Sequence, residues 1–138
     1  RRTNIIDPVV LWAAFKVEPT DPIALRTRIK EIAAYKKRTQ PLAEKSAGCM
    51  FRNPDDPSTG ERVSAGRIID ETGLKGLRLR SAEVSPRHAN FITIDRGGKA
   101  RDAIELGDLV RQRVFDACGI DLQREVVVWR RDESDPSD

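Results

Sequence analysis

The fold is decided by NFITIDRGGKARDAIELGDLVRQRVFDACG, residues 90–119. Residues 90–95 alternate two sets of side chains, as a strand does, and Gly97-Gly98 marks a turn after them. From about residue 100 to residue 117, apolar side chains recur at helical spacing, and Gly119 lies just past the last of them, where a left-handed backbone is common. We therefore predict a strand, a turn and a long helix. The apolar face of this helix consists of Leu106, Leu109, Val110, Val114 and Ala117.

Shorter elements are predicted on either side of this stretch. Residues 77–81 indicate a second strand, and the valine-rich residues 125–129 indicate a last one. Ser64 is placed to cap a short helix over residues 65–72. Because helices and strands are interleaved, we predict a mixed α+β (α/β) fold with one small sheet flanked by helices.

The first 40 residues are expected to belong to a different unit. Residues 9–15 form an unbroken apolar run, typical of a strand covered on both faces. A helix capped by Asp21 follows to about residue 37 and ends before Pro41. Because such a strand needs neighbours, its sheet is expected to lie partly in sequence absent here, and the chain is interpreted as a fragment. The charged residues 131–138 are expected to be disordered.

Composition limits the classes of function. The 138 residues are 38% hydrophobic and 34% charged, which is enough for one compact core. A net charge of +3 spread along the chain, with 5% aromatic residues, favours a small phosphate-bearing ligand over nucleic acid. No apolar run approaches a membrane span and no secretory signal is present, so we predict a cytoplasmic protein without a membrane partner. Cys49 and Cys118 lack the partners of a zinc site, so no metal is expected.

The candidate site is SAGCMFRNP, residues 46–54. Gly48 permits close approach of the backbone, Cys49 is a small ionisable group, and Asn53 can both donate and accept hydrogen bonds. We interpret this segment as a turn that holds one proton-carrying side chain against a ligand. Packing is the alternative for Cys49, because free cysteines are among the most buried residues.

Common catalytic motifs are absent from the sequence. There is no GxGxxG, Walker loop, HExxH or GxSxG, so any redox cofactor is expected to be held mainly by other sequence. A nucleophile pair would have to use His88, the single histidine, with Cys49 or Cys118. The spacing of these residues does not decide whether such a pair forms.

Four segments, in order, resemble the UDP-N-acetylenolpyruvoylglucosamine reductase (MurB) family. They are SAGCMFRNP (46–54), SAGRIIDETGLKG (64–76), AEVSPRHANF (82–91) and GIDLQREV (119–126). The resemblance covers roughly residues 38–128 and implies that residues 41–130 are the family's substrate-binding C-terminal domain. It also implies that residues 1–40 are the C-terminal strand and helix of a truncated FAD-binding domain.

The resemblance implies a flavoenzyme of peptidoglycan precursor synthesis. NADPH would reduce FAD, which would deliver hydride to the enolpyruvyl group of the UDP-sugar and give UDP-N-acetylmuramate. Cys49 matches the family's proton-donating serine or cysteine, Glu125 the glutamate and Arg1 the arginine that stabilise the enol. The implied substrate-binding residues are Asn53, His88 and Lys75. A thiol suits the first role, because with an ordinary pKa of about 8.5 it is protonated at neutral pH and is a stronger acid than a serine hydroxyl.

One departure from the family pattern and two alternative functions remain open. Arg80-Ser81 stand where the family usually has two glycines, which puts a close backbone approach in doubt. The alternatives are a stand-alone anion or nucleic-acid binding module without catalysis, and a thiol enzyme that uses Cys49 and His88. Under the reductase interpretation, this chain by itself should neither hold FAD nor catalyse the reaction.

Overall fold

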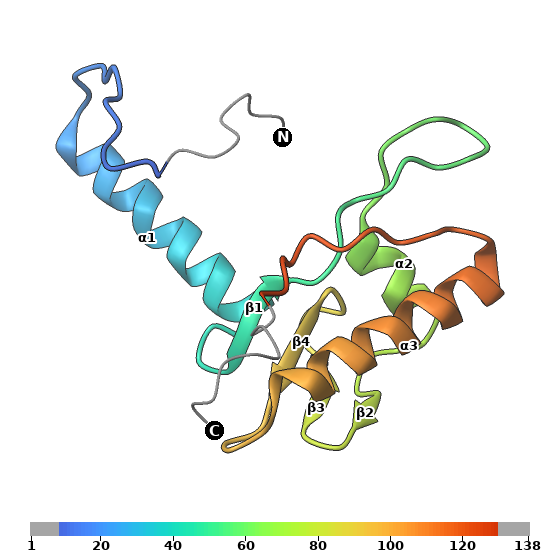
Figure 1. Cartoon of the computed structure of the whole chain (residues 1–138). Coiled ribbons are helices and arrows are strands. Elements are labelled where there is room, and N and C mark those ends of the chain that lie inside the picture. Colours follow the sequence, from blue (N-terminus) through green and yellow to red (C-terminus); the bar gives the residue numbers. More distant parts are fainter. Residues whose placement is uncertain (1–8, 130–138) are drawn as a thin grey trace.

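The computed structural model describes residues 9–129 and contains a four-stranded antiparallel sheet, two helices beside it and a third helix that extends away (Figure 1). The strands lie in the order β1-β4-β3-β2. In chain order the elements are α1 (Pro22–Thr39), β1 (Lys45–Cys49), α2 (Ala65–Glu71), β2 (Arg78–Leu79), β3 (Ala82–Val84), β4 (Phe91–Ile94) and α3 (Ala100–Cys118). The predicted α+β class, with a small sheet flanked by helices, is confirmed.

The centre of the fold follows from residues 90–119, as predicted. β4 lies between β1 and β3, and α3 packs against β2, β3 and β4. On the face of α3 that meets the sheet, Leu106, Val110 and Val114 are buried. Gly119 ends the helix with a φ of 72°, a backbone conformation that favours glycine because it has no Cβ.

The hydrophobic core lies between α3, the sheet and α2. The Ser64 hydroxyl caps α2 by accepting a hydrogen bond from the backbone N–H of Arg67 at 3.3 Å, as its position predicts. Ile68 and Ile69 of this helix then face the core. The largest fully buried side chains are Ile69, Leu106, Leu122, Val84, Val110, Val114, Pro41 and Ser85. All of them come from residue 41 onwards, so the compact part of the described chain begins there.

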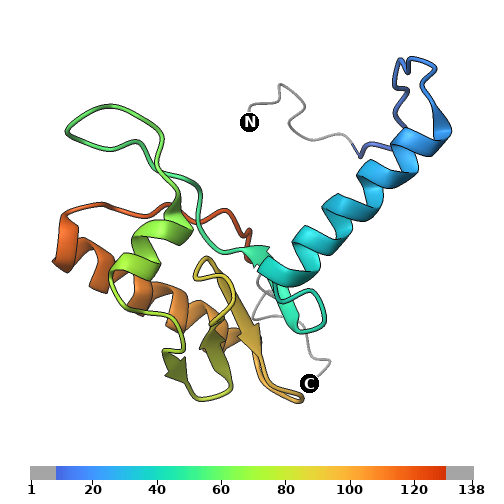
Figure 2. The ribbon, with the colours of Figure 1, turned by 180° about the vertical axis from the view of Figure 1, so that it is seen from behind.

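Helix α1 extends away from the sheet in both views and buries no side chain (Figures 1 and 2). Asp21 caps it as predicted, because its carboxylate accepts a hydrogen bond from the backbone N–H of Ile23 at 3.0 Å. An apolar stripe runs along this helix and is exposed, at Leu25 (48%), Ile29 (57%) and Ile32 (42%).

One predicted strand is wrong, and another is not formed within the described chain. Residues 9–15 and residues 125–129 form no strand in this structure. The first run is exposed throughout, and near the second the chain forms an isolated bridge between Phe51 and Arg124. A strand requires a neighbour that pairs with its backbone groups along its length. The sheet expected around residues 9–15 lies partly in other sequence, so that strand stays a prediction. Of residues 125–129, only Glu125 is paired in the described chain, through its N–H and the Met50 carbonyl.

The strand predicted over residues 77–81 is instead the first half of a hairpin, in which β2 pairs with β3. Arg80 lies in its turn with a φ of 51°, the left-handed region that favours glycine. Its guanidinium forms an ion pair with Asp102 at 3.4 Å and another with Glu105. The Ser81 hydroxyl donates a hydrogen bond to Asp102 at 2.5 Å. Arg80 therefore accepts a left-handed backbone, and together with Ser81 it attaches the hairpin to the first turns of α3.

No helix within residues 9–129 combines the length and the apolar character needed to cross a membrane. Across the same residues, no three His, Cys, Asp or Glu side chains are grouped so that they could hold a metal ion.

Candidate functional site

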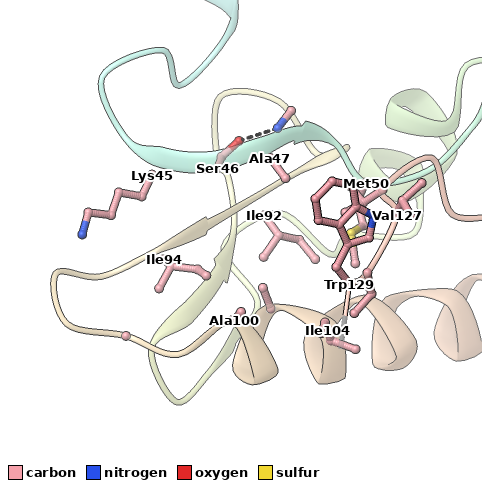
Figure 3. Close-up of a pocket in the computed structure, with 15 residues that line it drawn as sticks. Lys45, Ser46, Ala47, Met50, Ile92, Ile94, Ala100, Ile104, Val127 and Trp129 are labelled. Atoms are coloured by element: carbon pink, nitrogen blue, oxygen red, sulfur yellow. Dashed lines mark hydrogen bonds between the residues drawn. The ribbon is translucent and has the colours of Figure 1, made fainter. Parts of the chain in front are cut away.

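Cys49 is the last residue of β1 and is exposed, so the packing interpretation of this residue is wrong. The expected turn is also wrong, because residues 45–49 form an edge strand whose register with β4 is irregular between Ser46 and Cys49. Gly48 has a φ of +87°, and its N–H donates a hydrogen bond to the Ser46 hydroxyl at 3.0 Å (Figure 3). A glycine is therefore needed immediately before the thiol for conformational reasons.

Glu125 is brought next to Cys49 by backbone pairing. Its N–H donates a hydrogen bond to the carbonyl oxygen of Met50 at 2.9 Å. Its carboxylate lies 3.2 Å from the guanidinium of Arg52. Partial burial, and secondly the negative charge of Glu125, raise the pKa of the Cys49 thiol above its ordinary value. The thiol is therefore in its protonated form at neutral pH, which suits a proton donor and not a nucleophile.

Asn53 follows at the end of the same segment and is exposed. Its side-chain oxygen accepts a hydrogen bond from the backbone N–H of Ala65 at 3.1 Å, and its carbonyl accepts one from the side chain of Arg62 at 3.3 Å. Asn53 also lines an open polar pocket of about 560 Å³ together with the three arginines Arg52, Arg62 and Arg124. Guanidinium groups and an amide are suited to phosphate oxygens, and the carboxylates of Asp55 and Asp121 line the pocket as well.

His88 and Lys75 lie near one another but make other contacts. His88 is half-buried, its ring centroid lies 4.8 Å from that of Phe91, and its Nδ1 accepts a hydrogen bond from the backbone N–H of Asn90 at 3.3 Å. Burial, with a smaller effect of the Lys75 charge, lowers the pKa of His88. Lys75 forms an ion pair with Asp70 at 2.5 Å.

The nucleophile pair of the thiol-enzyme alternative is not formed. Within residues 9–129 no hydrogen bond joins His88 to Cys49, and the imidazole nitrogen that could act as a base toward a thiol is occupied by a backbone N–H. Arg1, the third predicted catalytic residue, lies outside the described residues.

An apolar cavity of about 440 Å³ lies on the other side of β1, beneath residues 126–129 (Figure 3). Gly48 and Met50 line it, whereas Cys49 between them does not. Apolar cavities are the usual first guess for a ligand site. None of the predicted site residues lines this one, so we place the candidate site at Cys49, Glu125 and the polar pocket of Asn53.

Two contributors were missed by the sequence analysis. Arg52 lies within the predicted segment, but its position beside Glu125 depends on pairing between distant parts of the chain. Asn90 was treated as the start of a strand. The signal that could have identified Asn90 is its side-chain amide, which can both donate and accept a hydrogen bond and stands directly before an apolar strand.

The thiol environment can be tested by alkylation of this chain. In a Cys118→Ser background, Cys49 is expected to react with iodoacetamide more slowly than free cysteine at pH 8, because its raised pKa leaves less thiolate. Glu125→Gln removes the negative charge, which is one of the two causes of the raised pKa, and should speed the reaction about two- to tenfold. Glu44→Gln is the control and should have no effect. A Glu125→Gln rate equal to that of the background would show that the carboxylate does not act on the thiol.

Comparisons with known proteins agree on one family. Residues 40–129 match the family model described as UDP-N-acetylenolpyruvoylglucosamine reductase, C-terminal domain. A protein of that name from Pseudothermotoga lettingae is 37% identical over 88% of this chain and 41% of its own length, and one from Chloroflexus aurantiacus is 46% identical over 88% and 38%. The crystal structure of UDP-N-acetylenolpyruvylglucosamine reductase (MurB) from Thermus caldophilus matches 83% of this chain and 38% of its own, with a TM-score of 0.64 and 37% identity. The chain thus spans about two fifths of the length of these relatives.

Proposed function

Because the chain belongs to the UDP-N-acetylenolpyruvoylglucosamine reductase family, we propose that the enzyme containing it reduces UDP-N-acetylenolpyruvoylglucosamine to UDP-N-acetylmuramate, with NADPH as reductant. The observation that supports this most directly is the proximity of Glu125 to a Cys49 thiol whose pKa is raised. A protonated thiol next to a carboxylate is suited to proton donation. The product is a precursor of peptidoglycan, and a cytoplasmic location remains a prediction.

The flavin is proposed to bind elsewhere in the enzyme. A pyrophosphate cradle needs glycines that open a helix and leave room for the ligand. Gly97-Gly98 precedes α3, but a Cβ built on Gly98 would lie 2.4 Å from the Ser81 hydroxyl and from Ile94, so this approach is filled by protein. We therefore assign no described residue to FAD. In the proposed enzyme FAD supplies the hydride that is added to the enolpyruvyl double bond.

Cys49 is proposed to supply the proton. Hydride addition to an unsaturated acid leaves negative charge on the carbon next to the carboxylate and on its oxygens, and that carbon must then be protonated. The raised pKa keeps the proton on the Cys49 sulfur until it is needed. The exposed position of Cys49 at the edge of the sheet leaves it accessible to a substrate that arrives from outside this domain.

Glu125 is proposed to stabilise the enol by accepting a hydrogen bond from its hydroxyl, and Arg1 by its positive charge. Arg52 lies 3.2 Å from that carboxylate and provides a balancing charge there. Asn53 is proposed to bind the diphosphate from the polar pocket. His88 and Lys75 are also proposed to bind the substrate, although neither of them lines the polar pocket.

The apolar stripe of α1 is proposed to dock on the rest of the enzyme, as part of an FAD-binding domain formed with residues 1–40. The supporting observation is that no side chain of this 18-residue helix is buried, although Leu25, Ile29 and Ile32 lie along it at helical spacing. An exposed apolar stripe of this kind marks an interaction surface.

The proposal is tested with the flavin-loaded full-length enzyme. We expect NADPH oxidation that depends on UDP-N-acetylenolpyruvoylglucosamine, together with a product that has gained two hydrogen atoms by mass spectrometry. UDP-N-acetylglucosamine, which lacks the double bond, is the control and should not support oxidation. The absence of substrate-dependent oxidation would exclude the reductase. The binding-module alternative is not favoured by the family, and it predicts steeply salt-dependent affinity for an anion instead.

A further inference from the structure

Asn90 is one of the few buried polar residues of the described chain, at 3% exposure. Both ends of its side-chain amide bond the backbone of a single residue, Phe51. The Asn90 Oδ1 accepts a hydrogen bond from the Phe51 N–H at 2.9 Å, and the Asn90 Nδ2 donates one to the Phe51 carbonyl at 2.8 Å. The main-chain carbonyl of Asn90 also accepts a hydrogen bond from the N–H of Met50 at 2.7 Å.

An asparagine side chain bonded in this way takes the place of a peptide group on a neighbouring strand. In an antiparallel pair, two opposite residues exchange both of their N–H to carbonyl bonds. The pairing of β1 with β4 reaches Cys49 opposite Phe91. The Asn90 amide continues the pairing beyond Cys49 along the chain of β1, where β4 has not yet begun.

The opposite edge of the same segment is held by the C-terminal part of the chain. The N–H of Arg52 donates to the carbonyl of Gln123 at 2.8 Å, and the N–H of Glu125 donates to that of Met50 at 2.9 Å. Residues 50–52 are therefore bonded on both edges. Asn90 holds one edge, and the segment that carries Glu125 holds the other.

This arrangement connects the groups of the candidate site. Cys49 lies immediately before residues 50–52, and Asn53 lies immediately after them. Glu125 is hydrogen-bonded to Met50 within this segment. A displacement of residues 50–51 would therefore move Cys49 relative to Glu125. Catalysis is sensitive to such movements, since a misplacement of about 1 Å can cost about a hundredfold in rate.

We propose that Asn90 is a positioning residue that sets the geometry between Cys49 and Glu125. The inference rests on the proposed function for its catalytic part, whereas the placement of the two side chains can be tested without it. An amide is required because the Phe51 backbone offers one donor and one acceptor, which a carboxylate or a methyl group cannot satisfy together. Leaving one of these buried groups without a partner is unfavourable.

The first test measures the coupling between Glu125 and Cys49 by alkylation of this chain in the Cys118→Ser background. With Asn90 intact, Glu125→Gln should speed alkylation of Cys49 about two- to tenfold. In the Asn90→Ala variant, Glu125→Gln should speed alkylation by less than about half as much, because the distance between the Cys49 and Glu125 side chains is no longer fixed. Thr93→Val alters a buried polar residue of β4 and should leave the effect intact. An effect that is undiminished by Asn90→Ala, or absent with Asn90 intact, overturns the proposal.

The second test uses the flavin-loaded full-length enzyme and the variant Asn90→Asp, which keeps the shape and loses the Nδ2 donor. We expect kcat to fall about 10- to 100-fold, with KM and the rate of flavin reduction by NADPH changed by less than about threefold. The positioning role is contradicted if flavin reduction by NADPH and reduction of the substrate slow equally, or if kcat is unchanged. If Asn90→Ala does not fold, Asn90→Asp replaces it in the alkylation test. If the unmodified enzyme shows no reductase activity, the proposed function fails, while the alkylation test still decides the role of Asn90.

Discussion

Replacing Cys49 by alanine in the flavin-loaded full-length enzyme is expected to reduce turnover by about 10²- to 10⁴-fold, the usual contribution of a general acid. The expectation follows from the protonated thiol at the end of β1, which the variant removes without filling the space. Flavin reduction by NADPH should continue at its normal rate, because it does not require that proton. Stopped-flow absorbance of the flavin, with NADPH alone and then with substrate, separates the two steps.

Three further variants give this experiment its controls. Cys49→Ser should keep most of the turnover, because a hydroxyl occupies the same position and also carries a proton. Cys118→Ala removes the other exposed thiol, at the far end of α3, and should leave turnover unchanged. Glu125→Gln tests the partner of the thiol and should lower turnover as well. Unchanged turnover in Cys49→Ala would remove Cys49 from the proposed mechanism.

Replacing Leu106 by alanine is expected to lower the free energy of unfolding of this chain by about 2–5 kcal/mol. Leu106 is completely buried on the face of α3 that packs on the sheet. The substitution removes buried apolar surface and leaves a cavity that close-packed neighbours fill only in part. Urea unfolding followed by far-ultraviolet circular dichroism measures the change.

The matched control is Leu25→Ala, which makes the same chemical change on a helix that buries no side chain. Leu25 is 48% exposed on α1, so we expect a change within about 0.5 kcal/mol in this chain. In the full-length enzyme the same variant should be destabilising if α1 docks there. A loss of several kcal/mol from Leu25→Ala in this chain would mean that α1 packs in a way that the structure does not show.

The sequence predicts well those elements whose backbone hydrogen bonds form within the element itself. Helices α1, α2 and α3 carry their own hydrogen bonds, and their ends are set by Asp21, Ser64 and Gly119, whose capping is visible in the sequence. Strands depend on partners. Residues 9–15 have strand-like composition but no partner in the described chain, and of residues 125–129 only Glu125 is paired, with Met50, so composition alone does not produce a strand at either place.

The hairpin of β2 and β3 was missed for a related reason. Its turn places Arg80 at a φ of 51°, where a glycine would have marked the turn in the sequence. In the candidate site, Cys49 and Asn53 are visible because they lie in one short segment. The contact of Asn90 with Phe51 joins residues 39 positions apart, and a single sequence gives no measure of such a distance.

The environment of Cys49 also affects how quickly its thiol is oxidised in a cell. Peroxides oxidise the thiolate and not the thiol, first to a sulfenic acid and then irreversibly to higher acids. An exposed cysteine is normally vulnerable to this damage. Because partial burial and the charge of Glu125 keep the proton on the Cys49 sulfur, the same environment that suits a proton donor slows its oxidation. The thiol of Cys49 is therefore expected to oxidise more slowly than its exposure alone implies.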